Sequence, residues 1–90
     1  MRQFPLCDMK TGTYARVVRL DTKGDLRRRF MDIGLVEGTP VECLRKSPAG
    51  DPKAYLIRGA VIAIRKEDAA TVMVEADLLR RSLPSRAIPM

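Results

Sequence analysis

The chain has 90 residues, which is enough for one small domain and leaves little room for a second. Seventeen lysines and arginines against eleven acidic residues give a net charge of +6, which suits a nucleic acid, an acidic protein surface or an anionic membrane. The longest apolar run, Ala60 to Ile64, is far shorter than the roughly 20 residues of a membrane-spanning helix, and no signal peptide is visible. We therefore expect a cytoplasmic protein.

The first twenty residues predict a helical turn followed by a strand. Residues Leu6 to Met9 are typical of a short helical turn, and Thr11-Gly12 is typical of a bend. From Tyr14 to Leu20, apolar and polar residues alternate with an imperfect period of two. We therefore expect the first strand over this segment.

A short amphipathic helix is expected next. Its apolar stripe is formed at a helical spacing by Leu26, Phe30 and Ile33. We expect Asp25 to act as the N-cap, because its carboxylate can accept hydrogen bonds from the open amides of the first turn. Gly34 is expected to end the helix with a left-handed backbone, and Leu35 to fold back onto the stripe.

The rest of the chain predicts four further strands. These are Thr39 to Lys46, Ala54 to Arg58, Val61 to Arg65 and Thr71 to Val74. Residues 47–52 are dense in turn formers, and the spacing around Gly59-Ala60 predicts a tight hairpin with glycine at its first turn position. Residues 66–70 predict a single helical turn. We expect a mostly β fold, a small five-stranded barrel with one added short α-helix, over residues 1–76 and a mobile tail over residues 77–90.

The residue inventory argues against catalysis and against a dedicated metal site. Histidine is absent, and Cys7 and Cys43 are too few and too far apart for a closed metal site or a disulfide framework. No phosphate-binding P-loop occurs, and no Ser or Cys has a histidine base. Asp51 together with Asp68 or Glu67 leaves a weak cation site open, although an aspartate before a proline more often shapes a loop. We expect a non-enzyme without a cofactor.

The order and spacing of several short motifs resemble the FeoA family of ferrous-iron transport proteins. The resemblance covers about residues 6–74 and rests on Arg29-Phe30, Gly34-Leu35 with Gly38, Gly50-Asp51-Pro52, and Gly59 through Ala69. It implies an SH3-like barrel with an added helix. It also implies a small cytoplasmic accessory protein that binds the membrane transporter FeoB, which carries a cytoplasmic G-domain, and that acts by regulation.

For such a protein we expect the helix, the residue after it and the loop around residues 47–53 to contact the partner. The candidate contact residues are Arg27, Arg28, Arg29, Leu35, Asp51 and Lys53. The alternative is a basic small barrel that binds nucleic acid, which the charge permits. Only Tyr14 and Tyr55 are placed to stack on bases, however, so that reading has few rings to support it. Free strand edges would also allow a homodimer.

Overall fold

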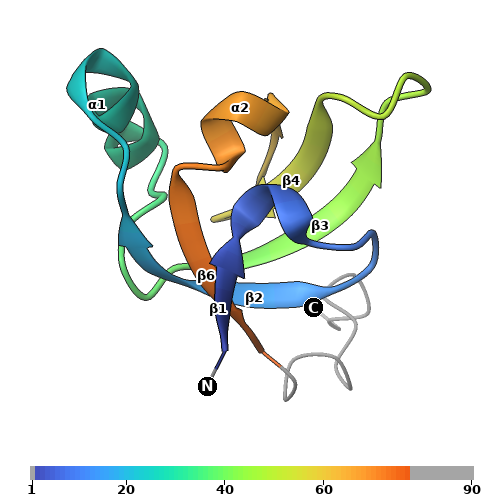
Figure 1. The fold of residues 1–90 in the computed structure, drawn as a ribbon, viewed down its shortest axis with the longest axis horizontal. Helices are drawn as coiled ribbons and strands as arrows, with labels where there is room; N and C mark the ends of the chain where they lie inside the picture. Colours follow the sequence, from blue (N-terminus) through green and yellow to red (C-terminus); the bar gives the residue numbers. More distant parts are fainter. Residues whose placement is uncertain (1, 78–90) are drawn as a thin grey trace.

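The computed structural model describes residues 2–77, which form one curved antiparallel sheet with helical segments gathered at one end (Figure 1). The strands are β1 (Gln3–Pro5), β2 (Tyr14–Leu20), β3 (Pro40–Lys46), β4 (Lys53–Ile57), β5 (Ala60–Ile64) and β6 (Val72–Ala76). The helices are the 3-10 turn η1 (Leu6–Asp8), α1 (Gly24–Asp32) and α2 (Lys66–Ala69). The order across the sheet is β1-β6-β2-β3-β4-β5. The prediction of a mostly β fold with one added helix is therefore confirmed.

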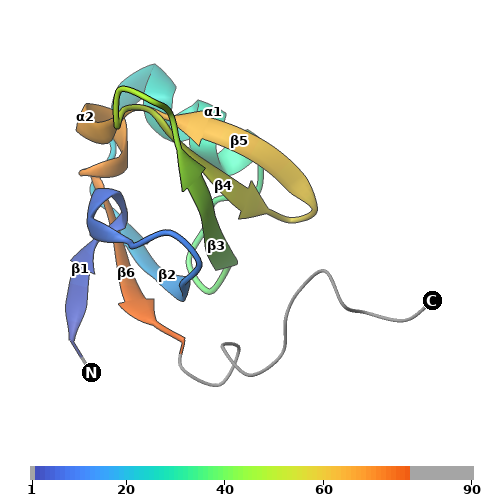
Figure 2. The same ribbon diagram turned by 90° about the vertical axis from the view of Figure 1, so that its right-hand side faces the viewer.

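The number of strands differs from the prediction, because six form where five were expected. The additional strand is β1, which pairs with β6 from Gln3 opposite Glu75 to Pro5 opposite Met73. Within residues 2–77, the two outer strands of the order, β1 and β5, do not pair with each other. The sheet curves like a barrel, but its hydrogen-bonded ladder stays open between these two edges (Figure 2).

Strand β2 has the predicted bounds, and β3 to β6 lie within two residues of the predicted ones at each end. The hairpin turn was predicted one residue too late. Its two turn residues are Arg58 and Gly59, both with positive φ (50° and 84°), and they join Ile57 to its partner Ala60. Positive φ at both positions is the type I′ pattern, whose twist matches that of the flanking strands. Glycine therefore takes the second turn position, and Arg58 accepts a conformation that is unusual for a side chain of its size.

The predicted N-cap of α1 is wrong, whereas its predicted end is confirmed. The helix begins at Gly24 after Lys23, which makes no side-chain cap, and Asp25 lies inside the first turn. There its charge still favours the positive end of the helix dipole. At the other end Gly34 adopts φ +90°, and the Leu35 amide donates to the Phe30 carbonyl at 2.9 Å. This left-handed residue ends the helix and turns the chain back toward the sheet.

The hydrophobic core fills the inside of the curved sheet and includes one side of α1. Phe30 is 5% exposed, as the helical stripe predicted, and Leu35 is completely buried, as expected of a residue that folds back onto this stripe. Cys43 is also completely buried and belongs to the same core. The main core residues from the sheet are Ala15, Val17, Val41, Tyr55, Ile57, Ile64, Val72 and Val74.

Candidate functional site

The helix α1, the short helix α2 and the loop between β3 and β4 all lie at the same end of the curved sheet (Figures 1 and 2). In both views α2 stands close to the β3–β4 loop, and α1 rises at the same end. The candidate contact residues come from α1 and from this loop. The fold therefore brings the two halves of the predicted contact surface to one end of the molecule.

The three arginines of α1 differ in what they contact. Nη1 of Arg27 donates to the Leu20 carbonyl at 3.0 Å, which ties the helix to the end of β2. Arg28 and Arg29 are exposed, and within residues 2–77 the structure records neither a hydrogen bond nor an ion pair for their guanidinium groups. Arg28 and Arg29 are therefore available to an anionic partner, as predicted for contact residues. Arg27 instead supports the position of the helix.

Leu35 has no exposed surface, because its side chain belongs to the core beneath α1. It shares that core with Phe30 from the apolar stripe of the helix. Leu35 thus lies under the candidate surface rather than on it, and it supports the position of α1.

Asp51 and Lys53 bind other parts of the same chain. Oδ1 of Asp51 accepts a hydrogen bond from the backbone amide of Lys66 at 2.8 Å, which ties the β3–β4 loop to the start of α2. Nζ of Lys53 donates to the backbone carbonyls of Cys7 at 2.7 Å and Met9 at 2.8 Å. Asp51 thus shapes the loop, and Lys53 connects β4 to the N-terminal turn.

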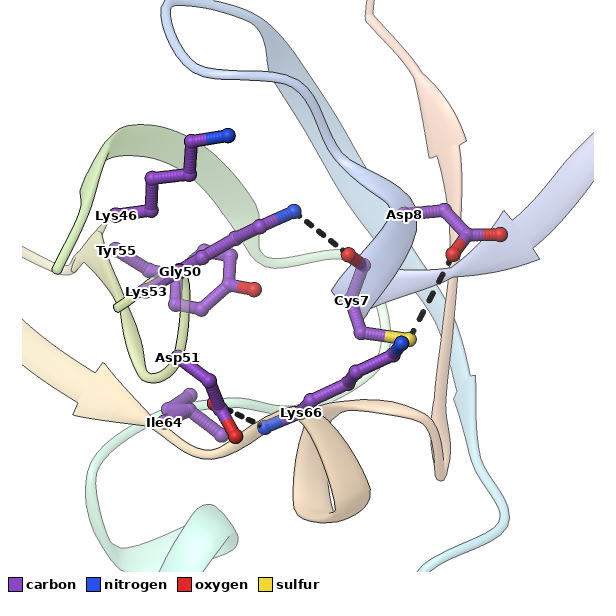
Figure 3. A pocket seen from close by; sticks show the side chains of 9 residues that line it. All are labelled: Cys7, Asp8, Lys46, Gly50, Asp51, Lys53, Tyr55, Ile64 and Lys66. Atoms are coloured by element: carbon purple, nitrogen blue, oxygen red, sulfur yellow. Dashed lines mark hydrogen bonds between the residues drawn. The ribbon is translucent and has the colours of Figure 1, made fainter. Parts of the chain in front are cut away.

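These contacts surround a charged hollow of about 210 Å³ between α2, the β3–β4 loop and η1 (Figure 3). Three ammonium groups and two carboxylates line it, together with a thiol and a phenol: Lys46, Lys53, Lys66, Asp8, Asp51, Cys7 and Tyr55. The mixture of charges gives the hollow no strong preference for one sign. Its polar contacts connect segments of this chain, so the residues around the hollow stabilise the fold.

Both thiols are poorly suited to binding a metal. Burial raises the pKa of the Cys7 thiol above its usual value, and the negative charge of the neighbouring Asp8 carboxylate raises it further. Burial also raises the pKa of the Cys43 thiol. A protonated thiol is a weak ligand and a weak nucleophile. Across the described part of the chain, no three His, Cys, Asp or Glu residues come together in a way that could hold a metal ion.

A second hollow, of about 230 Å³, is a groove between α1 and the edge strand β5. Its lining residues are Leu26, Arg29, Phe30, Ile33, Ile62, Ala63, Ile64, Arg65 and Asp68. The hairpin pattern of the sequence predicts that β5 pairs with β4, but it does not predict a groove on the other side of β5. The uncharged run from Ala60 to Ile64 was the available signal, but a sequence does not show that this strand lies at an edge.

The rings expected to stack on nucleic acid bases are not on the surface. Tyr14 is 9% exposed and Tyr55 is 1% exposed, and the Tyr55 hydroxyl donates to the Leu6 carbonyl at 3.4 Å. Stacking on bases requires an open ring face. Neither of these two tyrosines therefore offers the nucleic-acid alternative a ring platform. Among these same residues, no helix has the length and apolar character needed to cross a membrane.

Comparison with known proteins identifies the relatives of this chain. A family model described as the FeoA domain matches residues 4–76. A Porphyromonas gingivalis protein described as an Fe(2+) transport protein A/Fe(2+) transporter FeoB fusion protein is 34% identical over 70 residues, which span 78% of this chain and 8% of the fusion protein. The NMR structure of an FeoA-like protein from Clostridium acetobutylicum has a TM-score of 0.77 at 30% identity and covers 84% of this chain and 88% of its own.

A more distant structural relative settles the fold class. The zinc complex of Stenotrophomonas maltophilia FeoA, described as a procaryotic SH3 domain protein, has a TM-score of 0.69 at 24% identity. It covers 84% of this chain and 92% of its own. At this identity the likeness concerns the fold alone, and it confirms the SH3-like prediction. The predicted tail, apart from residue 77, lies outside the described residues.

Proposed function

The chain belongs to the FeoA family, and we propose that it is a cytoplasmic, non-enzymatic accessory protein of bacterial ferrous-iron uptake that binds a FeoB-type transporter. The observation that carries this proposal is the Porphyromonas gingivalis fusion, in which a region similar to this chain is part of one polypeptide with a FeoB transporter. Two domains within one polypeptide stay close together at a high effective concentration. A separate chain of the same family needs a docking surface to reach the same arrangement.

The end of the molecule that carries α1 supplies a suitable docking surface. Arg28 and Arg29 present exposed guanidinium groups that no other described residue engages, on a chain whose net charge is +6. Such groups accelerate encounter with an acidic surface and orient the two proteins. Arg27, Asp51 and Lys53 hold α1 and the β3–β4 loop in place through backbone contacts. We expect the partner to meet this end with a carboxylate-rich face of its G-domain or of its membrane portion.

Charge reversal at Arg28 tests this surface. Arg28→Glu should leave folding intact and weaken retention by the cognate FeoB-type transporter by about 1 kcal/mol, roughly fivefold, at low salt. Retention is measured by co-expressing the chain with the tagged transporter and titrating the purified proteins. Lys10→Glu is the matched control, because it makes the same charge change at an exposed residue in the loop before β2, away from α1 (Figure 1).

Two results would count against the proposal. If Arg28→Glu and the parent chain bind the transporter equally, α1 is not part of the interface. If the parent chain binds random-sequence DNA more tightly than the transporter, the nucleic-acid alternative takes precedence.

A further inference from the structure

Strand β5 has an open edge that is unusually apolar. Residues 60–64 of this strand pair with β4, and their backbone makes no hydrogen bond to any other part of residues 2–77. All of its residues are apolar: Ala60, Val61, Ile62, Ala63 and Ile64. Proteins usually protect such edges with charges, prolines or bulges, because an open edge is a template for another strand. This edge has none of these protections.

The register of the hairpin determines which backbone groups face outward. A tight two-residue turn makes its flanking residues, Ile57 and Ala60, a hydrogen-bonded pair. Bonded and non-bonded pairs alternate along an antiparallel ladder. Val61 and Ala63 therefore direct their N–H and C=O groups away from β4. These four groups are the ones that an additional strand would use.

The groove between α1 and β5 lies along this edge and is lined by apolar side chains. Ile62 and Ile64 belong to its lining on the strand side, and Leu26, Phe30 and Ile33 line it on the helix side. Side chains alternate along a strand, so every second residue of a strand added to β5 would point into this hollow. A groove between a helix and a free strand edge is the geometry that proteins use to bind peptides by strand addition.

The charged groups around the groove indicate the character of the occupant. Arg29 lies on the helix side, Arg65 lies at the end of β5, and Asp68 is the single acidic residue of the lining. Within residues 2–77, neither arginine side chain has a recorded hydrogen bond or ion pair. The lining of the groove therefore combines apolar side chains with an excess of positive charge.

We propose that the groove between β5 and α1 binds an extended segment of a partner protein, with an apolar residue flanked by carboxylates, as an additional strand on β5. The backbone of Val61 and Ala63 provides the main-chain hydrogen bonds, the groove receives the apolar side chain, and Arg29 and Arg65 pair with the carboxylates. The identity of the partner rests on the proposed function. The mode of binding does not, and it can be tested with peptides alone.

The experiment begins with a displayed library of random nine-residue peptides, selected on the full-length chain. Enriched peptides should share an apolar residue with acidic neighbours. A synthesised member should shift the amide resonances of Val61 and Ala63 in the isotope-labelled chain. N-methylation of that peptide at successive residues should weaken binding alternately, because only every second amide of an added strand faces β5. Uniform sensitivity, or shifts confined to another surface, would overturn the proposal.

Two proline variants test the edge directly. Val61→Pro removes an N–H group that points away from β4, so the sheet should stay intact while the peptide loses at least tenfold in affinity. Val61→Thr is the matched control, because it retains the N–H group at a similar side-chain volume. If Val61→Pro lowers the melting temperature sharply, Ala63→Pro takes its place. Peptide binding that survives both prolines would contradict strand addition.

Two further outcomes distinguish peptide binding at β5 from a homodimer and from the proposed binding of the transporter. The parent chain could form a dimer that Val61→Pro converts to a monomer. In that case a second copy of the chain would occupy the groove, and the assignment to a peptide would be overturned. Failure to capture the FeoB-type transporter, together with intact peptide binding at β5, would overturn the proposed function alone.

Discussion

Replacing Lys53 with methionine distinguishes a lysine that holds the fold from one that contacts a partner. Its Nζ donates to the carbonyls of Cys7 at 2.7 Å and Met9 at 2.8 Å. These carbonyls belong to the segment that places the completely buried Leu6 and the 1% exposed Met9 against the sheet. Methionine has a side chain of similar length and supplies neither hydrogen bond. The Lys53→Met variant therefore tests the bonds with little change in side-chain length.

The magnitude follows from the type of bond. A hydrogen bond to a charged group contributes about 1.5–3 kcal/mol, so two would give about 3–6 kcal/mol if they were additive and fully buried. Lys53 is only half-buried, and water can reach the carbonyls once the ammonium is gone. We therefore expect a loss of about 2–3 kcal/mol in the free energy of unfolding. For a domain of this size this corresponds to a melting temperature about 10–20 °C lower.

Urea denaturation measures this loss as a lower midpoint at an unchanged slope. Lys46→Met is the control: Lys46 lines the same hollow, is exposed and has no recorded side-chain hydrogen bond within residues 2–77. It should change the free energy of unfolding by no more than about 0.5 kcal/mol. Equal midpoints for Lys53→Met and the parent would refute the structural role. A variant that is as stable as the parent but binds the transporter more weakly would restore Lys53 as a contact residue.

Two further substitutions test the core. Phe30→Ala should cost about 3–5 kcal/mol in urea denaturation, whereas Met31→Ala, at a residue that is 49% exposed, should cost far less; similar midpoints would contradict the burial of the helical stripe. Burial raises the pKa of Tyr55 well above its usual value, so the folded chain holds this proton more tightly than the unfolded chain. The resulting stability is complete below the unfolded pKa of about 10 and decreases as the pH rises toward the folded value. Tyr55→Phe should therefore flatten the alkaline decline measured from pH 9 to 11, and an unchanged decline would assign it to other groups.

Local sequence patterns were sufficient to predict the elements that depend on residues close together in the sequence. The bounds of β2 follow from its alternation, and the end of α1 follows from Gly34, whose φ of +90° suits glycine. The three-residue strand β1 lacks any such pattern. It forms because β6, about seventy positions later, offers it an edge. A strand made by distant pairing cannot be recognised from its own residues.

The contacts of single side chains in the candidate site were also beyond what the sequence could predict. Sequence identified Arg27 and Arg28 as equivalent cations on one helix, but the first is bound to the Leu20 carbonyl, whereas no residue within 2–77 engages the second. Likewise, Lys53 was expected to face a partner, and its ammonium reaches a carbonyl 46 positions away. Charge can be read from the sequence, whereas the destination of a long charged side chain depends on which segments the fold brings beside it.

The end of the molecule that carries α1 thus offers a partner two kinds of contact with different physical character. Exposed guanidinium groups such as that of Arg28 act through long-range attraction, which salt screens over about 3 Å at 1 M ionic strength. The strand addition proposed at β5 would act through main-chain hydrogen bonds and apolar burial, which salt weakens little. If one partner uses both, the deficit of Arg28→Glu should disappear in high salt while that of Val61→Pro persists. The first contact then sets how fast the partner arrives, and the second sets how long it stays.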